Sequence, residues 1–114
     1  MTALSPTDFH VLLVLAADDL YGYAILKAVE QESSGAVRPE IGSLYRVLGR
    51  LMSSGLVVEA PAPDGDEGAH RGRARRYYRL TDLGRRTLKD DAGRLERALE
   101  IARDRALLPA PSEP

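Results

Sequence analysis

The hydrophobic pattern of the chain opens with a helix. The segment SPTD at 5–8 is a typical helix start: Ser5 can accept a hydrogen bond from the first-turn amides, and Pro6 suits the first helical position. Asp8 adds an acid to the first turn, and nearly every later residue of the predicted helix, 6–17, is apolar. A helix that is apolar around its circumference must be covered on several sides, which one small domain can hardly do alone. The pattern therefore predicts that a second copy of the chain helps to cover this helix.

A shorter helix follows, with turn residues on both sides. The sequence DDLYGY at 18–23 predicts a turn, and a helix of about ten residues should come next, with inward positions at Ile25, Leu26 and Val29. In SSGAVRP at 33–39, Gly35 suits the end of that helix and Pro39 prevents its extension.

A third helix is predicted over 41–54, and it has one apolar face. Its apolar residues are spaced three and four apart, at Ile41, Leu44, Val47 or Leu48, and Leu51. Gly55 then ends the helix. The positions left to face outward are Ser43, Tyr45 in part, Arg46 and Arg50.

The spacing then changes to that of a β-hairpin. LVVEA at 56–60 and RRYYRLT at 75–81 are strand-like, and the Pro-, Gly- and Asp-rich stretch between them predicts a long tip. Alternation puts Tyr78 on the same face as Leu80, which should point into the core. The opposite, outward face should carry Arg75, Tyr77 and Arg79.

The last helix should begin at Thr81, whose side chain can cap it, and should carry a heptad seam. The seam positions are spaced alternately four and three apart: Leu88, Ala92, Leu95, Leu99, Ala102 and Ala106. These leucines could bury against their own domain, but nothing is left in the chain to cover the second half of the helix. The seam therefore favours a dimer, and LPAPSEP at 108–114 predicts a disordered tail.

Charge is distributed unevenly along this pattern. The formal net charge is -1, yet residues 1–37 carry -4 and residues 38–79 carry +3. Residues 70–79 alone hold five arginines and no acid. Positive charge concentrated in the third helix and the hairpin indicates a surface for an anionic partner.

Composition excludes several other kinds of site. The chain has no cysteine, and its two histidines, His10 and His70, have no partners at ligand spacing, so neither a metal nor a cofactor is expected. The sequence does not indicate an enzyme, because it has no nucleophile with a base, no convincing carboxylate pair and no phosphate-binding glycine loop. The apolar run at 10–17 is too short to cross a membrane, and the start of the chain does not resemble a signal peptide, so we expect a cytoplasmic protein.

The order helix, helix, helix, hairpin, helix predicts a winged helix-turn-helix domain, mainly α with a small β-hairpin. We expect this domain over 1–81, a C-terminal dimerisation helix over 82–106 and a disordered tail over 107–114. In such domains the third helix enters the DNA major groove, and the hairpin, or wing, here about 56–80, reaches the backbone or minor groove.

Three segments resemble the PadR-like family of transcriptional regulators. They are YGYAILKAV at 21–29, GSLYRVLGRLMSSGLV at 42–57 and RRYYRLTDLGRRTL at 75–88, in the family's order and with compatible gaps. The short C-terminal region is similar to that of the small subgroup with a single terminal helix. Two features depart from the family: Arg46 stands where proline is common, and the wing tip at 61–74 is long and mixed in charge.

The resemblance implies a homodimer that binds a roughly palindromic operator in double-stranded DNA, usually as a repressor, with half-sites about one helical turn apart. It implies an interface between the first and last helices, for which the candidates are Phe9, Leu12, Leu13, Leu88, Leu95, Leu99 and Ala102. A small-molecule effector of unknown identity is a possible further partner.

The candidate DNA-binding residues lie on the second and third helices and the wing: Lys27, Ser43, Tyr45, Arg46, Arg50, Arg71, Arg73, Arg75 and Arg76. Arginine's planar fork suits phosphates and guanine edges, and Ser43 can offer a phosphate both its hydroxyl and its backbone amide. Each has a simpler interpretation. Tyr45 could be a core aromatic, the arginines could be solvated, and Arg79 nearby could pair with Glu59 across the strands. The alternative function is a winged-helix module that binds proteins without specific DNA binding.

Overall fold

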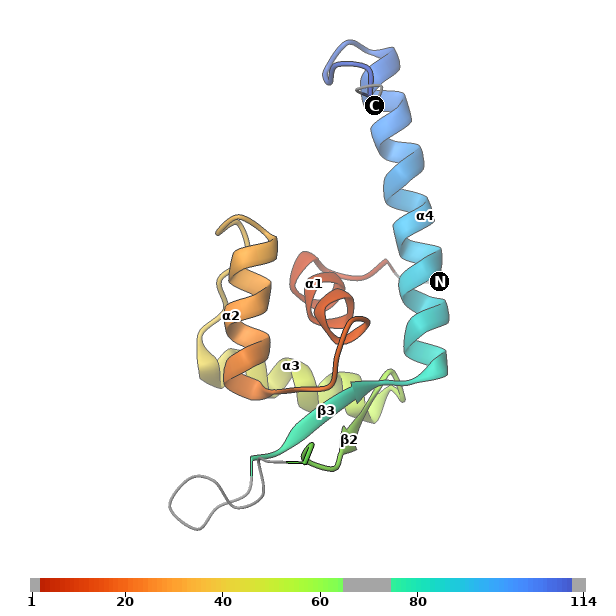
Figure 1. The fold of residues 1–114 in the computed structure, drawn as a ribbon. Helices are drawn as coiled ribbons and strands as arrows, with labels where there is room; N and C mark the ends of the chain where they lie inside the picture. Colours follow the sequence, from red (N-terminus) through yellow and green to blue (C-terminus); the bar gives the residue numbers. More distant parts are fainter. Residues whose placement is uncertain (1–2, 65–74, 112–114) are drawn as a thin grey trace.

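A computed structural model describes residues 3–64 and 75–111 of the chain. It contains four helices and a small antiparallel sheet with strand order β1-β3-β2 (Figure 1). The elements are α1 (Pro6–Leu15), β1 (Leu20–Tyr21), α2 (Gly22–Glu32), α3 (Ile41–Ser53), β2 (Val57–Ala60), β3 (Tyr77–Leu80) and α4 (Asp82–Asp104). This is the predicted winged helix-turn-helix arrangement with an additional C-terminal helix.

The predicted helix boundaries follow from capping interactions. The Ser5 hydroxyl accepts a hydrogen bond of 3.1 Å from the Asp8 amide at the start of α1. The Thr81 hydroxyl accepts one of 2.9 Å from the Gly84 amide at the start of α4, and donates one of 2.6 Å to the Gly55 carbonyl. Gly55 itself has a positive φ of 78° and ends α3 as predicted.

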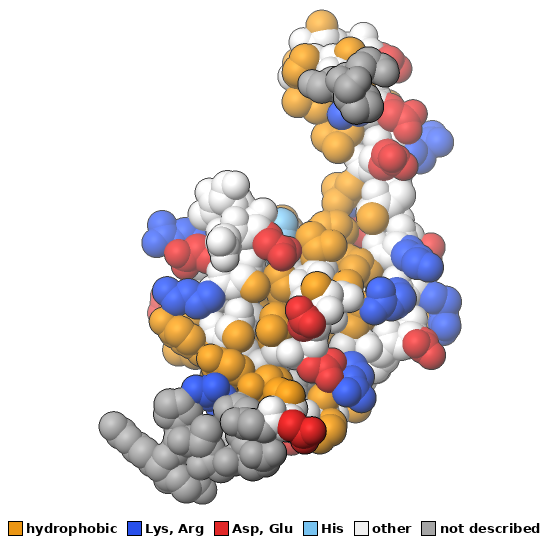
Figure 2. Space-filling model, viewed as in Figure 1, with side chains coloured by type: hydrophobic (Ala, Val, Ile, Leu, Met, Phe, Trp, Pro, Cys, Tyr) orange, Lys and Arg blue, Asp and Glu red, His pale blue; other side chains and the backbone are white. Residues whose placement is uncertain are grey.

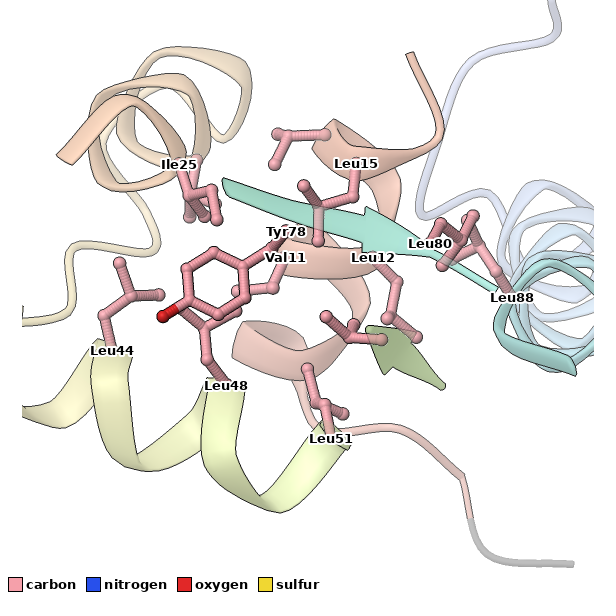
Figure 3. Close-up of a cluster of buried hydrophobic side chains, with 13 residues drawn as sticks. Val11, Leu12, Leu15, Ile25, Leu44, Leu48, Leu51, Tyr78, Leu80 and Leu88 are labelled. Atoms are coloured by element: carbon pink, nitrogen blue, oxygen red, sulfur yellow. The ribbon is translucent and has the colours of Figure 1, made fainter. Parts of the chain in front are cut away.

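The core lies between the first three helices and the sheet, with Tyr78 near its centre (Figure 3). Tyr78 is 2% exposed, which confirms its predicted place beneath the sheet. Leu44, Leu48 and Leu51 form the buried face of α3, but Ile41, expected on the same face, is 43% exposed. Ile41 is the first residue of α3 and is not among the side chains packed against the core.

Helix α1 is covered by its own chain more completely than its pattern predicts. Val11, Leu12, Val14 and Leu15 are buried, because α2, the sheet and α4 surround three of its sides. Leu12 is 0% exposed and Leu88 of α4 is 7% exposed. Neither side chain can contribute much to an interface with a second copy, so their assignment to the dimer interface is wrong and both belong to the core.

The sheet has one strand more than the sequence predicts. Leu20 and Tyr21 form β1, which pairs with Tyr78 and Tyr77 of β3 where a turn was expected. The ring of Tyr21 packs edge-on against Tyr77, with centroids 5.5 Å apart. Tyr77 is therefore 7% exposed, and its predicted outward position is wrong.

Helix α4 packs against α1, and its fully buried residues all precede Leu95. Leu88 is buried and Leu95 half-buried, whereas Leu99 is 45% exposed. Figure 1 shows the second half of α4 projecting away from the rest of the fold. The helix ends at Asp104, and Ala106, two residues later, has a φ of 61°. The Leu107 amide donates a hydrogen bond of 2.8 Å to the Ala102 carbonyl.

Candidate nucleic-acid interface

Helix α3 and strands β2 and β3 lie at one end of the molecule, opposite the free end of α4 (Figure 1). Because α3 buries one face against α1 and α2, its other positions face solvent. The residues proposed for DNA contact on α3 are thereby held on a rigid helix rather than on a loop.

Ser43 and Arg46 form the first pair of groups on this surface. Arg46 is exposed, and its Nη2 donates a hydrogen bond of 3.0 Å to the Ser43 hydroxyl. The hydrogen bond spans one helical turn and orients the guanidinium along α3. The pair therefore presents a fixed cation beside a hydroxyl, which is a suitable arrangement for a phosphate or a base edge.

Tyr45 lies at the junction of α3 with the start of α2. Its side chain is 49% exposed, so it is not a core aromatic. A Cβ on Gly22 would come within 2.7 Å of Tyr45 Cζ, so the ring lies directly on the backbone of Gly22. Glycine at this position allows the phenol to pack closely against the first turn of α2.

Arg50, another candidate for DNA contact, has a partner within the chain. Its Nη2 and Nη1 donate hydrogen bonds of 2.7 and 3.0 Å to the two carboxylate oxygens of Asp8 in α1. The hydrogen bond and the charge of Asp8 raise the pKa of Arg50 above its usual value. The sequence did contain a signal for this pair: Asp8 stands three and four residues before the buried Val11 and Leu12, and an acid on a buried face requires a partner.

The arginines at the base of the wing also have partners in the chain. The guanidinium of Arg75 lies 4.3 Å from the centroid of the Tyr21 ring, a cation–π contact. Arg76 Nε is 3.6 Å from a carboxylate oxygen of Glu59. These contacts orient the two arginines just before the start of β3, the central strand of the sheet.

The sequence suggested that Arg79 could pair with Glu59, but in the structure it pairs with Asp19. Its Nη2 is 2.6 Å from Asp19 Oδ2, and this contact raises the pKa of Arg79. The strand register explains the difference, because Arg79 stands opposite Val58 whereas Glu59 stands opposite Tyr78.

Among the other candidates for DNA contact, Lys27 is exposed on α2 with its Nζ 5.4 Å from the centroid of the Tyr23 ring. Arg71 and Arg73 lie outside the described residues.

The rest of the described chain offers a cavity between α1 and α4. It has a volume of about 280 Å³ and is lined by Leu4, Pro6, Phe9, His10, Asp91, Arg94 and Leu95. Within the described ranges, 3–64 and 75–111, no group of three or more potential metal ligands occurs, and none of the helices has the length and hydropathy needed to cross a membrane.

Comparison with known proteins identifies the family. The model of the transcriptional regulator PadR-like family matches residues 11–90. The chain belongs to this family. A relative, Transcriptional regulator Rv3488 from Mycobacterium tuberculosis, is 34% identical over 95 residues, which are 83% of this chain and 78% of the relative. The family consists of transcriptional regulators, not enzymes.

Solved PadR structures have the same fold. A PadR family transcription regulator from Clostridium difficile R20291 superposes with a TM-score of 0.71 over 88% of this chain and 97% of its own, at 22% identity. Bacillus subtilis PadR, solved in complex with operator DNA, superposes with a TM-score of 0.60 at 23% identity. That match covers 73% of this chain and 45% of the Bacillus chain.

Proposed function

We propose that this PadR-like protein is a dimeric repressor that binds a roughly palindromic DNA operator, with α3 in the major groove and the wing on the backbone or minor groove. One observation carries the proposal: the exposed polar face of α3 and the arginine-bearing base of the wing lie at the same end of the molecule. The Bacillus relative solved with operator DNA supports it.

The proposed DNA surface consists of groups with different roles. Arg46, held by Ser43, is the main candidate for contact with bases or phosphates from α3, since it is exposed and its guanidinium is hydrogen-bonded to a neutral hydroxyl. Arg75 and Arg76 at the wing base, Tyr45 beside α2 and Lys27 on α2 are candidates for phosphate contact. Arg71 and Arg73 remain candidates by sequence.

The proposed dimer forms through α1 and α4. Hydrophobic side chains are exposed over the body of the molecule and continue along α4 (Figure 2). Of the predicted interface, Leu13 and Leu99 are exposed, and Phe9, Leu95 and Ala102 are half-buried, so all five remain available to a second copy. A two-fold dimer would present two copies of α3 to two half-sites.

DNA binding is tested by fluorescence anisotropy on fragments of the protein's own promoter at several salt concentrations. Specific binding should weaken steeply with salt, by about 0.9 log units per log unit of salt for each phosphate neutralised. Arg46→Ala should weaken binding to the preferred fragment, and Arg73→Ala/Arg75→Ala/Arg76→Ala should also reduce the salt slope. Arg97→Ala, which removes an exposed arginine from α4, is the matched control and should leave both unchanged.

The alternative, a protein-interaction module, predicts a different result. In that case the wild type would show no preference for any promoter fragment over unrelated DNA of the same length. A reporter fused to the preferred promoter tests the sign of regulation: repression predicts lower expression with the wild type than with Arg46→Ala.

A further inference from the structure

The ion pair between Asp8 and Arg50 connects the first turn of α1 to the last turn of α3. The two side chains form two hydrogen bonds, of 2.7 and 3.0 Å, between the guanidinium fork and both carboxylate oxygens. This bidentate geometry fixes the relative orientation of the two planar groups as well as their distance. The residues are 42 positions apart in the chain, so the pair is a tertiary contact between two helices.

Burial distinguishes this pair from an ordinary surface ion pair. The side chain of Asp8 is only 10% exposed, whereas that of Arg50 is 56% exposed. The Asp8 amide is already used in capping by Ser5, and its carboxylate is directed to α3. A carboxylate this deeply buried is strongly unfavourable without a partner, so Arg50 cannot leave it freely.

We infer that Arg50 is a positioning residue and not a DNA contact: with Asp8, it sets the orientation of the recognition helix α3 relative to α1. This inference rests on the proposed function, in which α3 enters the groove and α1 belongs to the dimer interface. Both nitrogens of the Arg50 fork bind Asp8, so the fork is not available for bidentate contact with a phosphate or a guanine.

The position of the pair explains what it would control. In the proposed dimer, α1 packs near the two-fold axis and α3 contacts a half-site. The angle between α1 and α3 then determines where the two recognition helices lie relative to each other. The ion pair therefore determines which spacing of half-sites the dimer accepts. Arg46, in contrast, contributes to the contacts within each half-site.

The experiment uses DNA selected from a random-sequence library by the wild-type protein, and the same DNA with one base pair inserted at its centre. Affinity for both is measured at several salt concentrations, at a temperature where circular dichroism shows each variant to be folded. The variants are Asp8→Asn, Arg50→Gln, Arg50→Lys and the double variant Asp8→Asn/Arg50→Gln. Arg97→Ala serves again as the control.

A positioning role predicts a specific set of results. Asp8→Asn and Arg50→Gln should each weaken binding to the selected DNA about tenfold, and the double variant should be no weaker than the worse single variant, because both changes remove one interaction. The salt slope should stay at the wild-type value, and the preference for the selected spacing over the inserted spacing should shrink. Arg50→Lys, which keeps the charge but loses the fork, should not restore that preference.

A phosphate contact predicts the opposite pattern. Arg50→Gln would then lower the salt slope by about 0.9, Arg50→Lys would retain most of the affinity, and Asp8→Asn would leave binding unchanged or tighter. That pattern would overturn the inference, as would wild-type affinity, slope and spacing preference in all four variants. If the wild type itself binds no DNA selectively, the proposed function fails first.

Discussion

Two glycines of α4 occupy opposite environments and provide a direct test of the packing between α4 and the sheet. A Cβ on Gly84 would clash with the carbonyl oxygen of Leu56 and come within 2.7 Å of Leu80 Cδ1, whereas a Cβ on Gly93 would meet nothing within 4 Å. Gly84→Ala should lower the free energy of unfolding by about 1–3 kcal/mol through overpacking. Gly93→Ala should raise it by about 0.5–1 kcal/mol, because alanine is the better helix former.

Chemical denaturation of the two variants beside the wild type measures both effects. Analytical ultracentrifugation of the same samples should accompany denaturation, so that a change in oligomeric state caused by Gly93→Ala is not mistaken for a change in folding stability. Equal effects of the two substitutions would show that α4 does not approach Leu56 as closely as the structure has it.

The buried Tyr78 predicts a loss of stability at alkaline pH. Burial raises the pKa of its phenol above the usual value of about 10, an effect that a hydrogen bond with Arg76 partly opposes. In the unfolded chain the phenol ionises from about pH 10, while in the folded chain it remains protonated. The folded state then binds more protons than the unfolded state, so its stability falls as pH rises through this range.

The free energy of unfolding measured from pH 8 to 11 tests this. It should fall less steeply above pH 10 in Tyr78→Phe than in the wild type, whatever the difference between them at pH 8. Parallel curves would contradict the predicted role of Tyr78.

At the scale of single residues, the sequence predicted which positions are exposed better than it predicted their partners. The helical period placed Arg46 and Arg50 on the solvent side of α3, and both are exposed. It could not show that Arg50 reaches α1, because the distance between helices depends on tertiary packing. The strand period likewise placed Tyr77 and Tyr78 on different faces of the sheet. It could not show that Tyr77 is covered, because the covering residue, Tyr21, belongs to the unpredicted strand β1.

At the scale of elements, the strongest predictions came from termini with their own chemistry. Ser5 and Thr81 cap α1 and α4 as the sequence predicted, since capping depends on residues within one turn. The two residues of β1 were predicted as a turn, because so short a strand has no period to detect. It is a strand only because β3 provides its hydrogen-bond partners.

The chain adopts the same left-handed backbone conformation after α3 and after α4, but with a different residue at each place. Gly55, after α3, has a φ of 78°, and Ala106, after α4, has a φ of 61°. Only glycine adopts this region without steric cost. Gly55→Ala should therefore lower the free energy of unfolding by about 1 kcal/mol, and Ala106→Gly should raise the stability of the α4 end by a similar or smaller amount.

Thermal unfolding followed by circular dichroism measures both variants. The prediction requires opposite signs. A loss of stability in Ala106→Gly would show that, at the end of α4, the entropy that glycine adds to the unfolded chain outweighs the relief of the left-handed conformation.

At the scale of the whole molecule, the proposed dimer depends on side chains that lack contacts in a single chain. Leu99 is 45% exposed on the projecting half of α4. Burying a leucine contributes about 1.5–3 kcal/mol, and a two-fold interface buries two copies. Leu99→Glu should therefore weaken dimerisation by about a hundredfold or more, while the winged-helix body remains folded.

Leu83→Glu is the matched control, because Leu83 is 44% exposed in the first turn of the same helix but lies off the heptad seam. Analytical ultracentrifugation over a range of concentrations should show the control assembling like the wild type. A Leu99→Glu variant that remains dimeric at low micromolar concentration would place the interface elsewhere.

The projecting half of α4 has a consequence for how much protein the cell needs. Beyond Leu95 the residues up to Ile101 are exposed, so this end of the 23-residue helix has few tertiary contacts to stabilise it and should fray in the separated chain. Its backbone amides should exchange with solvent deuterium quickly in the separated chain and slowly once two chains associate. Association of two chains would cover the exposed residues of this half, so the protection of its amides should rise with protein concentration. In the proposed dimer, the association that covers this half of α4 also creates the pair of recognition helices, so occupancy of an operator with two half-sites would rise more steeply than in proportion to the protein concentration.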